Sequence, residues 1–167
     1  MSPRVRAALF GVLVLAALGC SKDRSGGRDQ RAVTAPQGLD CGHTACGSNF
    51  FIDSAQNGDC AAGANCSLSL TLVATGDLHI NDEYPYKFRA DDAQGVSFLG
   101  TDAAGPSIFS KAANNWQKTA PQTGVMTVAF QSAKGQKSVS GNFKLSVCSA
   151  ANCQLEQQTV STSITVH

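Results

Sequence analysis

The chain is poor in the side chains on which enzyme chemistry most often depends. It has only three histidines, at positions 43, 79 and 167, and one tryptophan in 167 residues. It contains no Gly-x-Ser-x-Gly nucleophile elbow, no phosphate-binding loop and no His-Glu-x-x-His zinc motif. Hydrolase chemistry therefore has no visible site in the sequence, and none of its motifs requires a cofactor.

Positive charge is also scarce in the part of the chain that we expect to fold. Residues 40–167 hold seven Lys and Arg against ten Asp and Glu, which gives a net charge of −3. Binding to nucleic acid normally requires a basic surface. The composition therefore predicts no nucleic-acid partner.

Helical periodicity is missing, and alternation with a period of two residues takes its place. Leu68, Leu70 and Leu72 alternate with small polar residues, which is the pattern of a strand with one buried side. The same alternation predicts strands at 125–131, 139–147 and 158–166, and shorter ones at 50–53, 78–80, 86–90 and 96–99. About seven to eight strands without a helix predict an all-β fold, an immunoglobulin-like antiparallel β-sandwich.

The longest stretch without a strand prediction is 100–123. It contains Phe109 and Trp116 among small and polar residues. A loop of this length is either functional or partly ordered by the packing of its aromatic side chains. We expect it to cover part of the domain.

Residues 1–19 have the composition of an export signal, because two arginines precede an apolar stretch that is short for a membrane span. The ending Ala17-Leu18-Gly19-Cys20 resembles a bacterial lipobox, in which the signal is cut before a cysteine that becomes lipidated. The resemblance implies an anchor at Cys20, and Ser21 implies sorting to the outer membrane. A plain secretory signal is the alternative. The expected location is the bacterial cell envelope, lipid-anchored on its periplasmic face.

Residues 20–39 are rich in Gly, Ser, Arg and Asp and have almost no apolar side chains. Such a segment cannot offset the entropy cost of folding. We therefore predict a disordered tether at 20–39 and one folded domain at 40–167, which is long enough to bury its own core.

Lipidation of Cys20 would leave six cysteines, an even number in an oxidising compartment. Two close pairs, Cys41 with Cys46 and Cys60 with Cys66, are predicted as structural disulfides, although spacing does not exclude other pairings. Cys41, His43 and Cys46 also have a tolerable spacing for zinc or copper. Metal-binding thiols must stay reduced, however, so we expect disulfides and no metal.

Cys148 and Cys153 lie at the mouth of a predicted hairpin, with four residues between them. Facing residues of such a hairpin are close enough for a disulfide. A ring of about six residues restricts the unfolded chain by only roughly 2 kcal/mol, so this bridge is a weak staple. Its position at the rim also leaves the sulfurs open to attack by a thiolate of another protein.

Two stretches, GDLHINDEYPYKFR and FKLSVCSAANCQLEQQTVSTSITV, carry a family resemblance. The run from Cys66 to Val166 resembles the N-terminal periplasmic domain of the thiol:disulfide interchange protein DsbD and its stand-alone relatives. That resemblance implies an immunoglobulin-like sandwich whose cysteine pair carries electrons between a membrane reductase and periplasmic partners. It implies that Cys153 forms the mixed disulfide and that Cys148 resolves it.

The resemblance also implies that Phe109 and Trp116 shield the disulfide as an aromatic cap, whereas the simpler alternative makes them core side chains. Gln154-Leu155-Glu156 stands where the family often has prolines. The membrane and thioredoxin-like domains of the full protein have no counterpart in the sequence, so we expect a separate periplasmic or membrane partner protein.

Two functions follow from these observations. The first is a lipid-anchored periplasmic thiol-disulfide exchange domain that uses Cys148 and Cys153. The second is a non-catalytic envelope lipoprotein, a binding or structural module with three structural disulfides. A metal-handling module built on Cys41, His43 and Cys46 is a third and weaker hypothesis.

Overall fold

The computed structural model describes residues 41–167, which form eleven β-strands and, within that range, no helix. The predicted signal at 1–19, the lipidation site Cys20 and the tether at 20–39 lie outside the described residues. No helix among residues 41–167 is long and apolar enough to cross a membrane.

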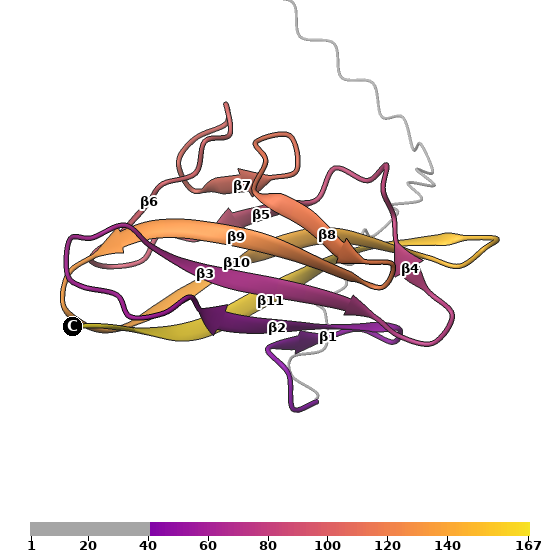
Figure 1. Cartoon of the computed structure of the whole chain (residues 1–167), viewed down its shortest axis with the longest axis horizontal. Helices are drawn as coiled ribbons and strands as arrows, with labels where there is room; N and C mark the ends of the chain where they lie inside the picture. Colours follow the sequence, from indigo (N-terminus) through magenta and orange to yellow (C-terminus); the bar gives the residue numbers. More distant parts are fainter. Residues whose placement is uncertain (1–40) are drawn as a thin grey trace, which may run out of the picture. The chain divides into compact units, whose positions relative to one another are not determined.

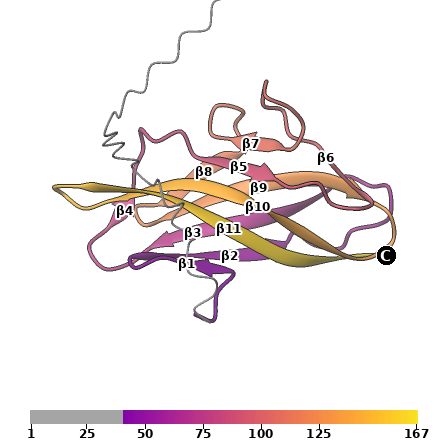
Figure 2. The ribbon, with the colours of Figure 1, turned by 180° about the vertical axis from the view of Figure 1, so that it is seen from behind.

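The strands form two antiparallel sheets that face each other (Figure 1, Figure 2). The first sheet contains, in spatial order, β1 (Ala45–Cys46), β2 (Phe50–Gln56), β3 (Cys66–Ala74), β9 (Thr123–Ser132) and β6 (Val96–Phe98), and β8 (Trp116–Ala120) also pairs with β9. The second sheet contains β11 (Cys153–Val166), β10 (Gly135–Cys148), β5 (Lys87–Ala90) and β7 (Ile108–Ser110), and β4 (His79–Ile80) also pairs with β10.

The strand order is that of an immunoglobulin-like sandwich. Strands β2, β3 and β9, with β8 and β6 beside β9, correspond to the A-B-E-D sheet of that fold. Strands β5, β10 and β11 correspond to its C-F-G sheet. The predicted fold class is therefore confirmed. The strand count is higher than the expected seven to eight because the structure adds short strands of two to five residues.

The core lies between the two sheets and is formed by the alternating apolar positions. Leu68, Leu70 and Leu72 of β3 are fully buried, as the period-two pattern predicts. Burial also holds for nearly all predicted inward positions of the other long strands: Met126, Val128, Phe130, Phe143, Leu145, Val147, Val160, Ile164 and Val166. Thr162, which the same alternation places inward with them, is only half-buried. Each sheet therefore contributes one apolar face to a common core.

The expectation that 100–123 contains no strand is wrong, because this stretch contains β7 and β8. Its aromatic side chains Phe109 and Trp116 are buried, which agrees with the alternative that their packing orders the stretch. All three residues of β7 are buried, so this strand has no alternation to detect. Trp116 of β8 lies over Gly124 of β9, where a β-carbon would be 2.2 Å from the indole ring. The strand depends on that close approach between two residues of different strands, which a linear pattern does not reveal.

The hairpin of β10 and β11 is the longest element of the described chain, with fourteen residues in each strand. Its register runs without interruption from Gly135 opposite Val166 to Cys148 opposite Cys153. The tip of the hairpin extends past β4 (Figure 1, Figure 2). The two cysteines are thereby placed at one end of the second sheet.

Candidate functional site

The six cysteines of the described residues form three disulfides, as predicted. The bridges join Cys41 to Cys46, Cys60 to Cys66 and Cys148 to Cys153. Each bridge therefore closes a short ring within its own pair.

The Cys148–Cys153 bridge crosses the hairpin between directly facing residues, whose Cα atoms are 4.0 Å apart. The amide of Ser149 donates a hydrogen bond to the carbonyl of Asn152, which closes the turn at the tip. Since hydrogen-bonded and non-hydrogen-bonded pairs alternate in an antiparallel ladder, Cys148 and Cys153 form a non-hydrogen-bonded pair. That geometry brings their side chains together on the outer face of the sheet.

The two sulfurs have different surroundings. Cys148 is 4% exposed because β4 pairs with β10 on its other side, whereas Cys153 is exposed. The Asn81 side-chain amide donates to Cys153 Sγ at 3.8 Å, and the Ser146 hydroxyl lies 3.9 Å from Cys148 Sγ. A thiolate from outside would therefore meet Cys153 first. Cys148 would leave beside a buried hydroxyl.

Tyr86 holds β10 next to this site. Its ring is fully buried, and its hydroxyl donates a 2.6 Å hydrogen bond to the carbonyl of Ser146. This carbonyl lies between the segment of β10 that pairs with β4 and the segment that pairs with β5, so the phenol replaces a missing strand partner. Burial raises the pKa of Tyr86 above its ordinary value, so the hydroxyl remains a donor.

Replacing Tyr86 by phenylalanine is expected to lower the free energy of unfolding by roughly 1–2 kcal/mol, because the buried carbonyl of Ser146 loses its donor. The stacking of the ring on Trp116, with centroids 4.0 Å apart, would remain. Urea unfolding followed by circular dichroism measures the effect. Tyr84→Phe is the matched control, since the Tyr84 hydroxyl makes no hydrogen bond among the described residues. Equal losses in the two variants would contradict this account.

Lys118 of β8 holds β4, the short strand that pairs with β10 next to the disulfide. Its ammonium donates to the carbonyl of Ile80 at 3.3 Å and to the carboxylate of Asp82 at 2.7 Å, which ties β4 to β8. The hydrogen bond from Lys118 lowers the pKa of Asp82. No local sequence pattern marks Asn81, Tyr86, Lys118 or Ser146 as site residues, because their roles depend on contacts between distant strands.

The predicted cap residues lie in strands, not in a loop. Phe109 is fully buried in β7 and packs against Phe88 and Phe98. Trp116 is 8% exposed in β8 and stacks on Tyr86. Core packing accounts for both rings, which is the simpler of the two alternatives. Shielding of the disulfide by them stays a prediction.

The Cys41–Cys46 ring contains the proposed metal residues but does not present them as ligands. Both sulfurs are in the disulfide. The His43 ring stacks on Phe51 with centroids 3.9 Å apart, and its Nδ1 lies 2.8 Å from the carboxylate of Asp53. Residues 41–167 hold no group of three or more His, Cys, Asp and Glu placed to bind a metal ion. The oxidised pair removes the two thiolates that the metal-handling hypothesis requires.

The Cys60–Cys66 ring holds the end of β11. Cys60 is 2% exposed, and its carbonyl accepts a 2.9 Å hydrogen bond from the amide of His167. The amide of Ala62 donates back to the carbonyl of His167, also at 2.9 Å. This bridge therefore stabilises the contact between the β2–β3 connection and the last residue of the described chain.

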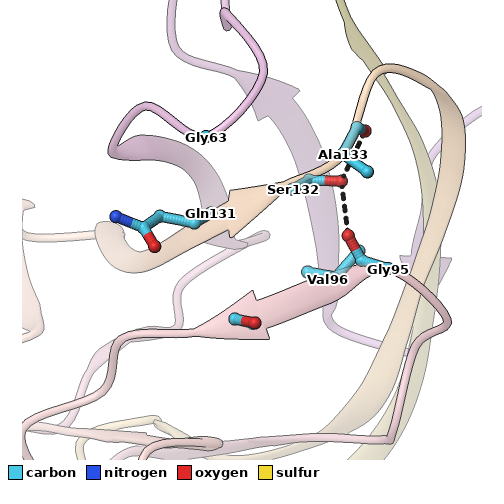
Figure 3. Close-up of a pocket in the computed structure, with 7 residues that line it drawn as sticks. Gly63, Gly95, Val96, Gln131, Ser132 and Ala133 are labelled. Atoms are coloured by element: carbon cyan, nitrogen blue, oxygen red, sulfur yellow. Dashed lines mark hydrogen bonds between the residues drawn. The ribbon is translucent and has the colours of Figure 1, made fainter.

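A shallow cavity of about 360 Å³ lies near the same end of the sandwich and is lined by the paired strands β6 and β9, the turns at their ends and Gly63 of the β2–β3 connection (Figure 3). The Ser132 hydroxyl lies 2.9 Å from the carbonyl of Gly95 and 3.0 Å from that of Ala133 and can donate its one proton to either, and the carbonyl of Ser132 accepts from the amide of Gly63. No charged side chain lines it. Its polar groups thus serve the contact between strands and loops and offer no reactive group.

Comparisons with known proteins give no family. No protein-family model matches the chain, and no curated protein matches it. Among solved structures, AggA, the major subunit of aggregative adherence fimbriae type I from Escherichia coli, resembles it with a TM-score of 0.33 and 8% identity. That match covers 75% of this chain and 100% of AggA. A likeness at this level carries no argument about function, so the fold assignment rests on the strand order of the chain itself.

Proposed function

We propose that this protein is an exported envelope protein whose sandwich acts as a binding or structural module, with its three disulfides as staples. The observation that carries the proposal is that all six cysteines of residues 41–167 are bridged within short rings at strand ends. Disulfides of this kind persist in oxidising compartments outside the cytosol. The predicted export signal at residues 1–19 and the lipobox-like ending at Cys20 support the same location, with anchoring to the outer membrane.

The experiment is graded reduction by a dithiol, followed by alkylation of free thiols and mass spectrometry. Structural bridges have reduction potentials below about −300 mV. The proposal therefore predicts that all three pairs become labelled only under conditions that also unfold the sandwich, measured by circular dichroism on the same samples. Early release of one pair from a folded domain would contradict a purely structural role for that pair.

Thiol-disulfide exchange at Cys148–Cys153 is the second candidate, and one observation favours it. Cys153 is the only cysteine of the described residues that is exposed. A partner thiolate would attack Cys153 Sγ and break the bridge, with Cys148 leaving as the thiolate and taking up a proton. A second thiolate of the partner would then attack the partner's own sulfur in the mixed disulfide and release Cys153. The domain is reduced by two electrons, and the partner is oxidised to a disulfide.

Trapping separates this candidate from the first. The reverse reaction can be trapped: in a Cys148→Ser variant the Cys153 thiolate still attacks the disulfide of an oxidised partner, but Cys148 is no longer there to attack Cys153 Sγ and release that partner. A true exchange partner would therefore accumulate as a covalent complex on non-reducing gels. Cys153→Ser is the matched control, because its remaining thiol is on the buried residue. Complexes of equal yield in both variants would indicate unspecific oxidation.

A further inference from the structure

The outer face of the second sheet carries a basic groove. The groove lies away from the disulfide along β10, with Lys144 four residues before Cys148. The basic groove is lined by three cationic side chains and one carboxylate, together with amide and apolar side chains: Lys87, Arg89, Lys144, Asp91, Asn142, Gln157, Ala104 and Ile108. Its volume is about 530 Å³. Arg89, Lys144 and Gln157 are exposed, so the groove is open to solvent.

The register of four strands builds this groove. Lys87 of β5 lies directly opposite Lys144 of β10, and Arg89 lies opposite Asn142. Gln157 of β11 faces Lys144 from the other side, and Ile108 of β7 faces Arg89. These side chains point outward because their strand neighbours, such as Phe88 and Phe143, point into the core.

The charges in the basic groove are not paired within the protein. Like charges directly opposite each other on neighbouring strands are destabilising, and Lys87 and Lys144 are such a pair. The ion pairs among the described residues are His43 with Asp53 and Lys118 with Asp82. Three of the seven cationic side chains in residues 40–167 therefore gather in one groove of a domain whose net charge is negative.

Two carboxylates lie near these cations, and each already accepts hydrogen bonds elsewhere. Asp91, which lines the groove, accepts from the hydroxyl of Ser140 at 3.1 Å. Asp102 accepts from the hydroxyl of Ser110 and from the amide of Ala104. These hydrogen bonds lower the pKa of Asp102, with a smaller contribution from the charge of Lys87. The cations still outnumber the carboxylates by three to two.

We propose that the basic groove binds a negatively charged glycan, that is, a sugar chain bearing carboxylate or phosphate groups. The guanidinium of Arg89 suits such oxyanions because it can donate two parallel hydrogen bonds, and the two lysines add charge. The amides of Asn142 and Gln157 offer donors and acceptors for sugar hydroxyls. The inference rests on the binding role proposed above and names its ligand class.

Other polyanions fit the basic groove less well. No aromatic side chain lines it, so it lacks the stacking surface on which single-stranded nucleic acids depend. The exposed large hydrophobic side chain of the described residues is Leu155, which does not line it, so nothing here inserts into lipid. A glycan needs neither feature.

Calorimetric titration of the intact oxidised protein with hexagalacturonate and with mannose 6-phosphate tests the proposal, and maltohexaose is the neutral probe. We expect hexagalacturonate or mannose 6-phosphate to bind and maltohexaose not to bind. Lys87→Gln combined with Lys144→Gln should weaken binding roughly tenfold or more, since each removes a charge-assisted contact. Tighter binding of hexagalacturonate or of mannose 6-phosphate shows whether the groove prefers carboxylate or phosphate groups.

The matched control is Lys134→Gln combined with Lys137→Gln, which removes the same charge outside the groove and should change binding less than about twofold. Three outcomes would each overturn the proposal. The two double variants could lose binding equally, both anionic probes could fail to bind, or a single-stranded oligonucleotide of similar charge could bind equally well. The Lys87 and Lys144 double variant should keep or slightly raise its unfolding free energy, because it removes a destabilising like-charge pair. If no anionic glycan binds, the result of the reduction experiment is not affected. The ligand class and the structural role of the disulfides are therefore tested separately.

Discussion

Replacing Phe143 by alanine is expected to lower the free energy of unfolding by about 3–5 kcal/mol. Phe143 is fully buried in the middle of β10 and makes edge contacts with Phe88 and with Trp116. Its removal leaves a cavity between the two sheets, because rings on both sides lose a partner at once. For a domain of this size the loss is a large part of a total stability of about 5–15 kcal/mol.

Guanidinium unfolding, followed by the fluorescence of Trp116 and independently by circular dichroism, measures the effect. Leu155→Ala is the matched control, since Leu155 lies on the neighbouring strand and is 67% exposed. That change should cost less than about 0.5 kcal/mol. A loss below about 1 kcal/mol for Phe143→Ala would show that the core closes around the deleted ring, contrary to the packing described here.

The long strands of this protein can be predicted because one physical pattern dominates them. In β3 and β9 every second side chain is buried, so an apolar residue at every second position marks the strand directly. The same pattern predicts the buried positions from Val139 to Val147 in β10. Local sequence is sufficient here, because each strand faces solvent on one side and the core on the other.

The short strands and the residues around the disulfide could not be predicted, because they depend on contacts between residues that are far apart in the sequence. Strand β8 depends on the close fit of Trp116 over Gly124, and these two residues belong to different strands. The buried phenol of Tyr86 serves a carbonyl of β10, at Ser146. The spacing of Cys148 and Cys153 did predict their bridge, but the burial of Cys148 follows from β4, which approaches from an earlier part of the chain.

The basic groove could not be found in the sequence for a similar reason. Lys87 and Lys144 are far apart along the chain, and a domain with a net charge of −3 offers no sign of a basic site. Only the register of β5 against β10 places the two ammonium groups opposite each other, with Arg89 beside them. The strand pairing that completes the core thus also concentrates charge on the outer face.

Gly141→Val is expected to destabilise the fold by about 3 kcal/mol or more, at or above the upper end for overpacking a core. A β-carbon on Gly141 would lie 2.3 Å from the carbonyl oxygen of Arg89 and 2.6 Å from Cζ of Phe88. The ring of Phe88 could turn aside, but the carbonyl belongs to the backbone of β5, so the strand itself must move. That movement would displace Lys87 and Arg89, and hexagalacturonate binding should weaken together with stability.

Ser138→Val on the same strand is the matched control, because Ser138 is exposed and valine suits a strand. Its unfolding free energy should change by less than about 0.5 kcal/mol, and its binding should not change. Combining Gly141→Val with Phe88→Leu separates the two contacts. The double variant should recover little stability, since the contact with the Arg89 carbonyl remains. Full recovery would mean that the aromatic ring alone limits the space at Gly141, and that β5 does not need to shift.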